Sequence, residues 1–206
     1  MKKNLGVAGE LFPQSVFIVV SYGEDGTPNA MNVAWGGECT RTQVAINIGD
    51  HKTTDNILAR GAFTVAPADA AHVAEADYFG IATGRRVNKA EGSGLTFTRS
   101  EFVDAPVIEE FPLTMECRVV SVEDWAGEKR FVGEIVNTRV DEAVLDGEGR
   151  VDFSQMRPIV YDSTRRLPGR RGGGRRRLER GEGLDVGSTQ QRAEGLSGRP
   201  EGRPSL

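Results

Sequence analysis

The sequence has few of the side chains that carry out most enzymatic reactions without a cofactor. Its 206 residues include two histidines, His51 and His72, and two cysteines, Cys39 and Cys117. Two histidines leave little for a zinc site or a Ser-His triad. The cysteines lack metal-ligand spacing, and a domain of this size does not need a lone disulfide, so we expect reduced thiols. The sequence contains no HExxH, G-x-S-x-G, CxxC or Walker motif, and no G-x-G-x-x-G follows a predicted strand. The composition is compatible with a hydrolase that uses two carboxylates, but nothing in the sequence singles out a pair. The chain therefore needs a bound cofactor, or it is a binding module.

Long apolar runs are also missing. None approaches the roughly 20 residues that a membrane-spanning helix needs. The apolar stretch at residues 16–20 is too short and too far from the first residue for a signal peptide, and no small-residue cleavage site follows it. We therefore expect a cytoplasmic protein with no membrane partner.

The charged residues divide the chain into a long acidic part and a short basic part. Residues 165–206 carry 11 of the 26 basic residues and 5 of the 30 acidic ones, a net charge of +6. The preceding 164 residues are therefore acidic, with a net charge of −10. An acidic body is a poor partner for nucleic acid or anionic lipid.

Hydrophobic periodicity predicts many short strands and little helix. β-Branched and alternating segments predict strands at residues 16–22, 29–35, 44–48, 62–66, 113–122 and 131–140. The turn signal Gly-Glu-Asp-Gly at residues 23–26 joins the first two strands into a hairpin. Short helices are predicted at residues 54–60, opened by Thr54 and closed by Gly61, and at residues 70–79. Several antiparallel strands with few helices indicate a mainly β, closed or nearly closed barrel.

From Arg165 onward the sequence has no apolar period and is rich in arginine and glycine. Such a segment cannot bury enough apolar surface to offset its conformational entropy. We therefore expect one domain, residues 1–164, followed by a disordered Arg/Gly-rich tail, residues 165–206.

Four blocks of the body resemble a known family. Residues 26–35 read GTPNAMNVAW, similar to the family strand G-x-P-N-x-M-(T/S/N)-V-A-W. Residues 47–57 read NIGDHKTTDNI, like the family's phosphate-holding strand end and helix start. Residues 77–89 read DYFGIATGRRVNK, and residues 105–117 read APVIEEFPLTMEC. In this order they resemble the flavin reductase-like family of FMN-binding split barrels, which includes flavoredoxin, over about residues 10–163.

The resemblance implies an antiparallel Greek-key split β-barrel with a few short helices that binds FMN non-covalently. It also implies a homodimer with FMN near the subunit interface. No catalytic acid or base is required, because the flavin carries the chemistry and the protein supplies placement and electrostatics.

The phosphate of FMN would lie at the start of the first predicted helix. A helix N-terminus offers free N–H groups and a favourable dipole to an anion. His51, Lys52, Thr53 and Thr54 are the candidate ligands, since Lys52 adds a positive charge and the threonines add hydroxyl donors. In the alternative interpretation, Thr54 is only an N-cap and Lys52 only a surface charge.

The flavin ring would lie along the second predicted strand. A strand presents alternating N–H and C=O groups to the polar edge of a flat ring, and by resemblance residues 29–34 do this largely through the backbone. Asn32 could add a side-chain contact, and Trp35 either walls the site or is a core aromatic. The candidate residues are Asn29, Met31, Asn32, Val33, Ala34 and Trp35.

Two cations of the third block complete the candidate site. By resemblance Lys89 and Arg85 lie near the flavin, and we expect Lys89 to meet the phosphate. A cation at the N1–C2=O edge would instead raise the flavin potential. The alternative for Arg85 and Arg86 is solvated surface charge. A redox role for Cys39 is disfavoured because free cysteines are usually inert, and Cys117 is predicted to lie in the core.

Three functions compete. The first is an oxidoreductase that takes electrons from NAD(P)H and passes them through FMN to free flavin or a partner protein. The second is a flavoredoxin-like electron carrier that does not oxidise a nicotinamide. The third is a split barrel that binds another ligand, such as haem, or none.

The end of the sequence departs from the family. After residue 164 the family usually continues with a segment of the form Y-x-x-(L/V)-G-E-x-x-G, which is missing here. We hypothesise a shift of reading frame near Arg166, because out-of-frame GC-rich DNA tends to encode arginine and glycine. The alternative is a genuine basic tail that binds nucleic acid or an acidic partner.

Overall fold

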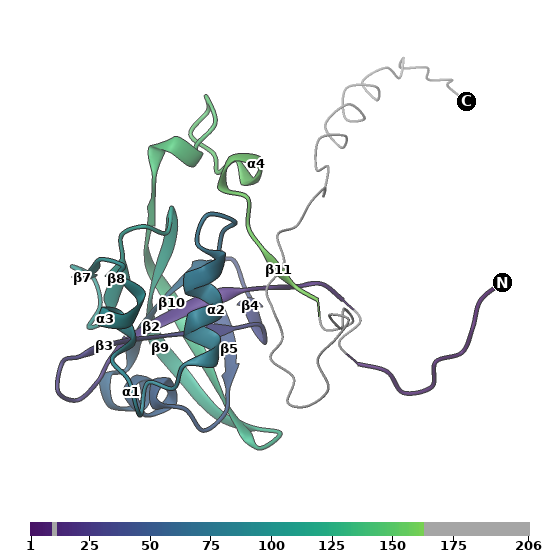
Figure 1. Cartoon of the computed structure of the whole chain (residues 1–206), viewed down its shortest axis with the longest axis horizontal. Coiled ribbons are helices and arrows are strands. Elements are labelled where there is room, and N and C mark those ends of the chain that lie inside the picture. Colours follow the sequence, from purple (N-terminus) through teal and green to yellow (C-terminus); the bar gives the residue numbers. More distant parts are fainter. Residues whose placement is uncertain (10–11, 163–206) are drawn as a thin grey trace, which may run out of the picture.

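The computed structural model describes residues 1–9 and 12–162, which form a mainly β domain (Figure 1). The segment at residues 165–206, expected to be disordered or out of frame, lies outside the described residues. The strands are β1 (Gln14–Ser15), β2 (Phe17–Tyr22), β3 (Pro28–Val33), β4 (Gly36–Glu38), β5 (Gln43–Ile48), β6 (Ala62–Pro67), β7 (Phe97–Arg99), β8 (Pro106–Ile108), β9 (Leu113–Trp125), β10 (Glu128–Val140) and β11 (Val160–Tyr161). The helices are α1 (Lys52–Arg60), α2 (Val73–Ile81), α3 (Lys89–Ser93) and α4 (Phe153–Met156), with a 3-10 turn, η1, at Glu142–Val144.

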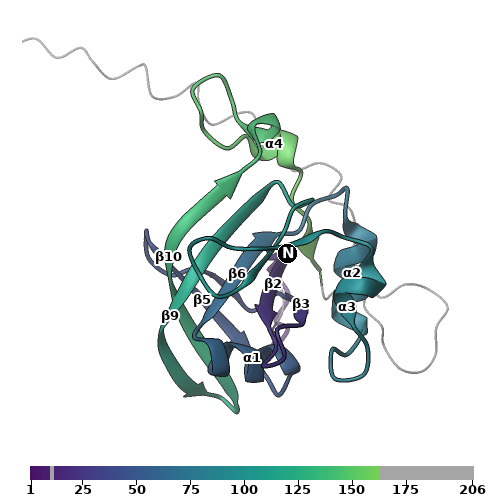
Figure 2. The same cartoon turned by 90° about the vertical axis from the view of Figure 1, so that its left-hand side faces the viewer.

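One curled antiparallel sheet dominates the domain. Its seven strands follow the order β3-β2-β6-β9-β10-β5-β4. Figure 2 shows how the long strands β9 and β10 bend around one side, while α1 covers one end and α2 and α3 lie beside β3. The pairs β1–β11 and β7–β8 are separate. The expectation of an antiparallel β fold with short helices is therefore confirmed.

The predicted hairpin is the start of this sheet. Strands β2 and β3 pair in register from Phe17 opposite Val33 to Tyr22 opposite Pro28. Gly26 adopts a positive φ of 79°, and the Gly23 N–H donates to the Thr27 carbonyl, so the glycines supply the turn that the sequence predicted. Within residues 1–9 and 12–162, no strand lies on the other side of β3, which makes β3 an edge of the sheet.

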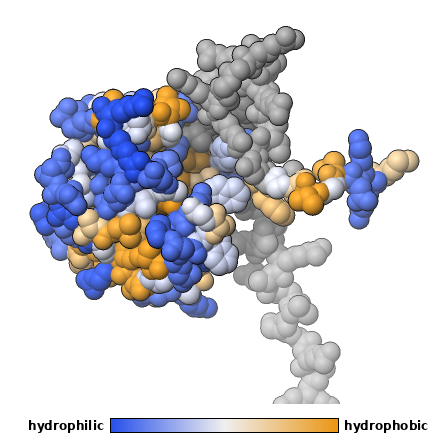
Figure 3. Space-filling view, turned by 90° about the horizontal axis from the view of Figure 1, so that it is seen from below, coloured by the Kyte–Doolittle hydropathy of each residue, from blue (hydrophilic) through white to orange (hydrophobic). Residues whose placement is uncertain are grey.

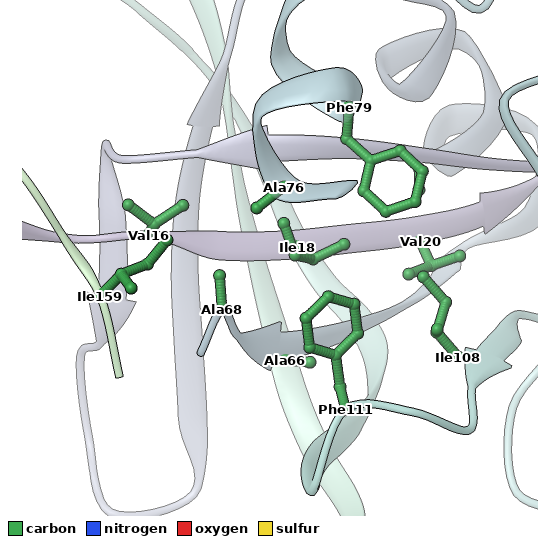
Figure 4. Packing of buried hydrophobic residues seen from close by; sticks show 11 residues of the cluster. Val16, Ile18, Val20, Ala66, Ala68, Ala76, Phe79, Ile108, Phe111 and Ile159 are labelled. Carbon is green, nitrogen blue, oxygen red and sulfur yellow. The ribbon is translucent and has the colours of Figure 1, made fainter. Parts of the chain in front are cut away.

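The hydrophobic core fills both faces of β2. Ile18 and Val20 point into a cluster that α2 closes with Ala76 and Phe79 (Figure 4). Val19, on the opposite face, belongs to a second cluster inside the curl of the sheet. A strand buried on both faces reads as a continuous apolar run, which is why residues 16–20 lack alternation.

Several boundaries differ from the predicted ones. Helix α1 begins at Lys52 rather than Thr54, and Gly61 ends it in the left-handed conformation as expected. Helix α2 begins at Val73 rather than residue 70, because the Asp69 carboxylate accepts the N–H groups of Ala71 and His72 and holds a turn there. Among the described residues, no helix is long and apolar enough to cross a membrane.

Candidate functional site

The two segments predicted to bind the ligand, strand β3 and the start of helix α1, are joined by one hydrogen bond. The Asn29 side chain, on β3, donates from Nδ2 to Thr53 Oγ1, in the first turn of α1, at 2.8 Å. Asn29 is 3% exposed and Thr53 is 1% exposed, so the junction is closed to water. A Cβ placed on Gly84 would clash with Asn29 Oδ1 and come within 3.5 Å of Lys52 Cδ. The sequence blocks around residues 29, 52 and 84 therefore converge.

The start of α1 keeps backbone donors for a ligand. His51 occupies the N-cap position, and its side chain makes no cap hydrogen bond. By contrast, Asn88 caps α3 and Asp152 caps α4 with their side chains. The N–H groups of Lys52 and Thr53 lie in the first turn, where the helix offers no acceptor. The end of α1 at Lys52 is therefore suited to an anion.

Thr54 has a different role from the one in the N-cap interpretation. Its hydroxyl donates to the Gly49 carbonyl at 2.6 Å and so fastens the loop that precedes the helix. The N-cap interpretation of Thr54 is wrong, because the helix begins two residues earlier. Thr53 accepts from Asn29, and its own hydroxyl hydrogen can still be donated.

A cavity of about 540 Å³ opens beside this junction. Lys52, Gly84 and Arg85 line it, together with Gly23, Glu24, Asp25, Asp55 and Asn56. The Arg85 guanidinium donates from Nη2 to Asp50 at 2.5 Å and to Asp55 at 3.0 Å. These bonds raise the pKa of Arg85 and lower the pKa of Asp50. The guanidinium is therefore held in place at the cavity, and two carboxylates share its charge.

The side chains of β3 beyond Asn29 face protein. Val33 is buried in the core cluster inside the curl, and Met31 packs against that cluster. The Asn32 amide donates from Nδ2 to the Ala76 carbonyl of α2 at 2.9 Å. A ligand along β3 would therefore meet mainly backbone groups, as the resemblance implied, and the expected side-chain contact from Asn32 stays a prediction.

A second cavity, of about 520 Å³, lies just past the end of β3. Ala34 and Trp35 line it from the predicted ring-binding segment. Trp35 is 50% exposed, so the core-aromatic interpretation is wrong. Arg130 and Asn47, which are cross-strand partners on β10 and β5, also line this cavity.

Sequence reasoning did not name Arg130, and it placed Asn47 only within the phosphate-holding block of residues 47–57. Asn47 stands between the buried residues Ile46 and Ile48, so alternation alone places it on the other face of β5. That pattern was the available signal for Asn47. Arg130 carried no comparable signal, because its position depends on the pairing of β10 with β5.

Lys89 occupies a place that the sequence did not predict. It is 5% exposed, and its Nζ donates to the carbonyls of Ala30, at 2.9 Å, and Phe79, at 2.8 Å. Desolvation lowers the pKa of Lys89 to about 8. Lys89 lines neither cavity described above. The expected phosphate contact is therefore not supported by this geometry.

The two cysteines differ in environment. Cys39 is exposed at the second cavity, and its Sγ donates to the Gln43 carbonyl at 3.5 Å. Cys117 is buried, as predicted, and burial raises its pKa to about 12. A thiol with this pKa stays protonated at neutral pH, so Cys117 is an inert part of the core.

Comparison with known proteins gives consistent matches. Residues 9–167 match the family described as flavin reductase like domain. An uncharacterised protein of Archaeoglobus fulgidus is 28% identical over 146 residues, which is 69% of this chain and 81% of that protein.

Solved structures match over most of the chain. The flavoredoxin of Desulfovibrio vulgaris (Miyazaki F) superimposes with a TM-score of 0.78 at 31% identity, covering 92% of this chain and 99% of that one. A flavoredoxin from Methanosarcina acetivorans matches with a TM-score of 0.71 at 24% identity, covering 91% of this chain and 98% of that one, and shows the fold alone. The curled antiparallel sheet is therefore the split barrel that the sequence predicted.

Proposed function

This chain belongs to the flavin reductase-like domain family, and we propose that it binds FMN non-covalently and transfers electrons through it. The observation that carries the proposal is the buried Asn29–Thr53 hydrogen bond, which joins the edge strand β3 to the start of α1. Strand β3 is suited to the edge of the flavin ring and the start of α1 to the phosphate, and the hydrogen bond holds these two elements together.

The donors at the start of α1 fit a phosphate dianion. We propose that the N–H group and the ammonium of Lys52, which lines the cavity, bind its oxygens, and that buried Thr53 positions this turn through its bond to Asn29. His51 and Thr54 flank this turn, and the bond from Thr54 to the Gly49 carbonyl holds its shape. Arg85, fixed by its two aspartates, is the neighbouring cation at the same cavity.

The ring would lie along the backbone from β3 to Trp35. Residues 29–34 offer main-chain groups, and half-exposed Trp35 offers an aromatic surface where the second cavity begins. A cavity of about 520 Å³ is within the usual range for small-molecule sites. In this arrangement Met31, Val33 and Ala34 contribute through the backbone, and the chain orients the ring while excluding water from one side.

Bound FMN supplies the redox chemistry, taking electrons from a donor and giving them to an acceptor. We propose NAD(P)H as the donor and free flavin or a partner protein as the acceptor. The second candidate is an electron carrier without nicotinamide oxidation, and the 31% identity to a flavoredoxin favours it.

We also propose a homodimer. Trp125 and Val120, on the long β9–β10 hairpin, and Trp35 are each about half exposed. Independently of these three residues, Figure 3 shows apolar side chains gathered on one face of the domain, amid a mostly hydrophilic surface. Contiguous exposed apolar surface is typical of protein interfaces.

Two measurements test the function. The purified protein, mixed with FMN and separated from excess by gel filtration, should retain the yellow flavin spectrum; a colourless protein would instead support another ligand or none. Anaerobic stopped-flow mixing with NADH or NADPH then separates the candidates. Rapid bleaching of the flavin band supports the reductase, whereas bleaching only by a reduced protein donor supports the carrier.

A further inference from the structure

We infer that Lys89 is a positioning residue that fastens the edge strand β3 to the end of helix α2 and so keeps the flavin site in shape without touching the ligand. The inference rests on the proposed function, because the site that Lys89 supports is the proposed FMN site. It replaces the phosphate contact that the sequence suggested.

The geometry gives Lys89 two backbone partners on different elements. Its ammonium donates to the carbonyl of Ala30, in the middle of β3, and to the carbonyl of Phe79, in the last turn of α2. Lys89 is itself the first residue of α3. A single side chain therefore holds together three elements that no strand ladder connects.

The charge of Lys89 is suited to this position. Within residues 1–9 and 12–162, no carboxylate lies within ion-pair distance of its Nζ. An unpaired buried cation is costly, but the Phe79 carbonyl belongs to the negative end of the α2 dipole. Two charge-assisted hydrogen bonds and the helix end together offset part of the cost of burying this charge. A methionine would fill the same space but leave both carbonyls without their donor.

The position of this link connects it to the ligand site. Ala30 directly follows Asn29, whose side chain makes the buried bond to α1. Asn32 makes a second link from β3 to α2 through the Ala76 carbonyl. The loop between α2 and α3 carries Gly84 against Asn29 and Arg85 at the first cavity. Without Lys89, the Asn32 bond and the packing of Ala76 and Phe79 would still hold α2 against β3, but the link at Ala30 would be lost and the ring edge and the loop would loosen.

Riboflavin, which lacks the phosphate, separates positioning from direct contact. We would measure dissociation constants of FMN and riboflavin for wild type, K89M, K52M and K129M by quenching of flavin fluorescence. K129M is the control, because Lys129 pairs with Asp124 on the β9–β10 hairpin and lines neither cavity. We expect K89M to raise the dissociation constants of both flavins by a similar factor, roughly tenfold. K52M should raise the dissociation constant of FMN and leave that of riboflavin unchanged, and K129M should change neither dissociation constant.

A loss in K89M confined to FMN would overturn the inference, because it would mean that Lys89 contacts the phosphate. Unchanged binding of both flavins would also overturn it.

Hydrogen exchange tests the same inference without a flavin. In the flavin-free protein, K89M should speed exchange of the amides in β3 and in residues 73–93 by about tenfold, whereas K129M should leave them unchanged. Equal exchange in K89M and wild type would refute the positioning role. Should K89M be recovered unfolded, K89Q, which keeps N–H donors without the charge, serves for the same comparison and should show a smaller increase.

This second readout also separates two kinds of failure. A wild-type protein that binds neither flavin would refute the proposed function, while the exchange result would still decide whether Lys89 fastens β3 to α2.

Discussion

Replacing Asn29 by alanine tests the junction on which the proposed site depends. The variant removes the donor to Thr53 Oγ1 and leaves a 1% exposed hydroxyl without that partner. Deleting one partner of a buried neutral hydrogen bond costs about 1–3 kcal/mol, so we expect the free energy of unfolding to fall by about 2 kcal/mol. With a urea dependence of about 2 kcal/mol per molar, the unfolding midpoint falls by about 1 M.

A double-mutant cycle isolates this bond. T53V keeps the shape of the threonine and removes its hydroxyl, so N29A, T53V and the double variant close the cycle. We expect a coupling energy of about 1 kcal/mol from urea unfolding. The FMN dissociation constant, measured by fluorescence quenching, should rise about tenfold in N29A because the two halves of the site are no longer joined.

Asn137 offers a matched control. Its Nδ2 donates to Glu116 Oε2 at 3.0 Å, within the β9–β10 ladder and away from both cavities. N137A should lower stability by a similar amount and leave FMN affinity unchanged. The reasoning is refuted if N29A and N137A affect FMN binding equally, or if the cycle shows no coupling between Asn29 and Thr53.

The remaining predictions concern packing, charge and pH. G84A should lower the free energy of unfolding by about 1–3 kcal/mol and should also lower FMN affinity, because its methyl group meets the Asn29 carboxamide. G147A should change neither quantity, because no atom lies within 4 Å of the added carbon. Urea titrations and FMN binding assays measure both effects. R85A should weaken FMN several-fold and flatten the salt dependence of binding with little change in stability; a salt dependence identical to wild type would contradict this. Folding lowers the pKa of Lys89 from 10.5 to about 8. Between these two pH values Lys89 is therefore protonated in the unfolded chain and largely deprotonated in the folded protein. The unfolding free energy of wild type relative to K89M should therefore rise as the pH increases through this window, and a flat or falling difference in urea midpoints between pH 7 and 9.5 would contradict it.

The strands of the sheet could be predicted because their pattern is local. Residues 17–22 and 28–33 were predictable as a hairpin, since β-branched runs flank a Gly-containing turn. The alternation in residues 113–122 marked β9, although the strand runs on to Trp125, where its side chains are exposed and carry no burial pattern. The start of α1 was placed two residues late, because Thr54 has the composition of an N-cap but bonds back to Gly49.

The site was predictable in its segments but not in the direction of each side chain. Lys89 stands in a run of polar and charged residues, and nothing local shows that its ammonium turns inward to Ala30 and Phe79. The bond between Asn29 and Thr53 joins residues 24 positions apart, so it follows from the curl of the sheet rather than from any periodicity. The exposure of Trp35 likewise could not be predicted, because this residue lies past the end of β3, where the alternation of the strand no longer indicates which side chains are buried.

The two outer strands of the sheet differ in how they avoid joining another chain. Exposed strand edges are templates for intermolecular pairing and aggregation. Strand β4, at one end, is only three residues long and offers little to pair with. Strand β3 is six residues long, and there the Lys89 ammonium takes up the Ala30 carbonyl while the Asn32 side chain fastens α2 beside the strand. We therefore expect the side chains that shape the ligand site also to make β3 a poorer template for pairing with another chain.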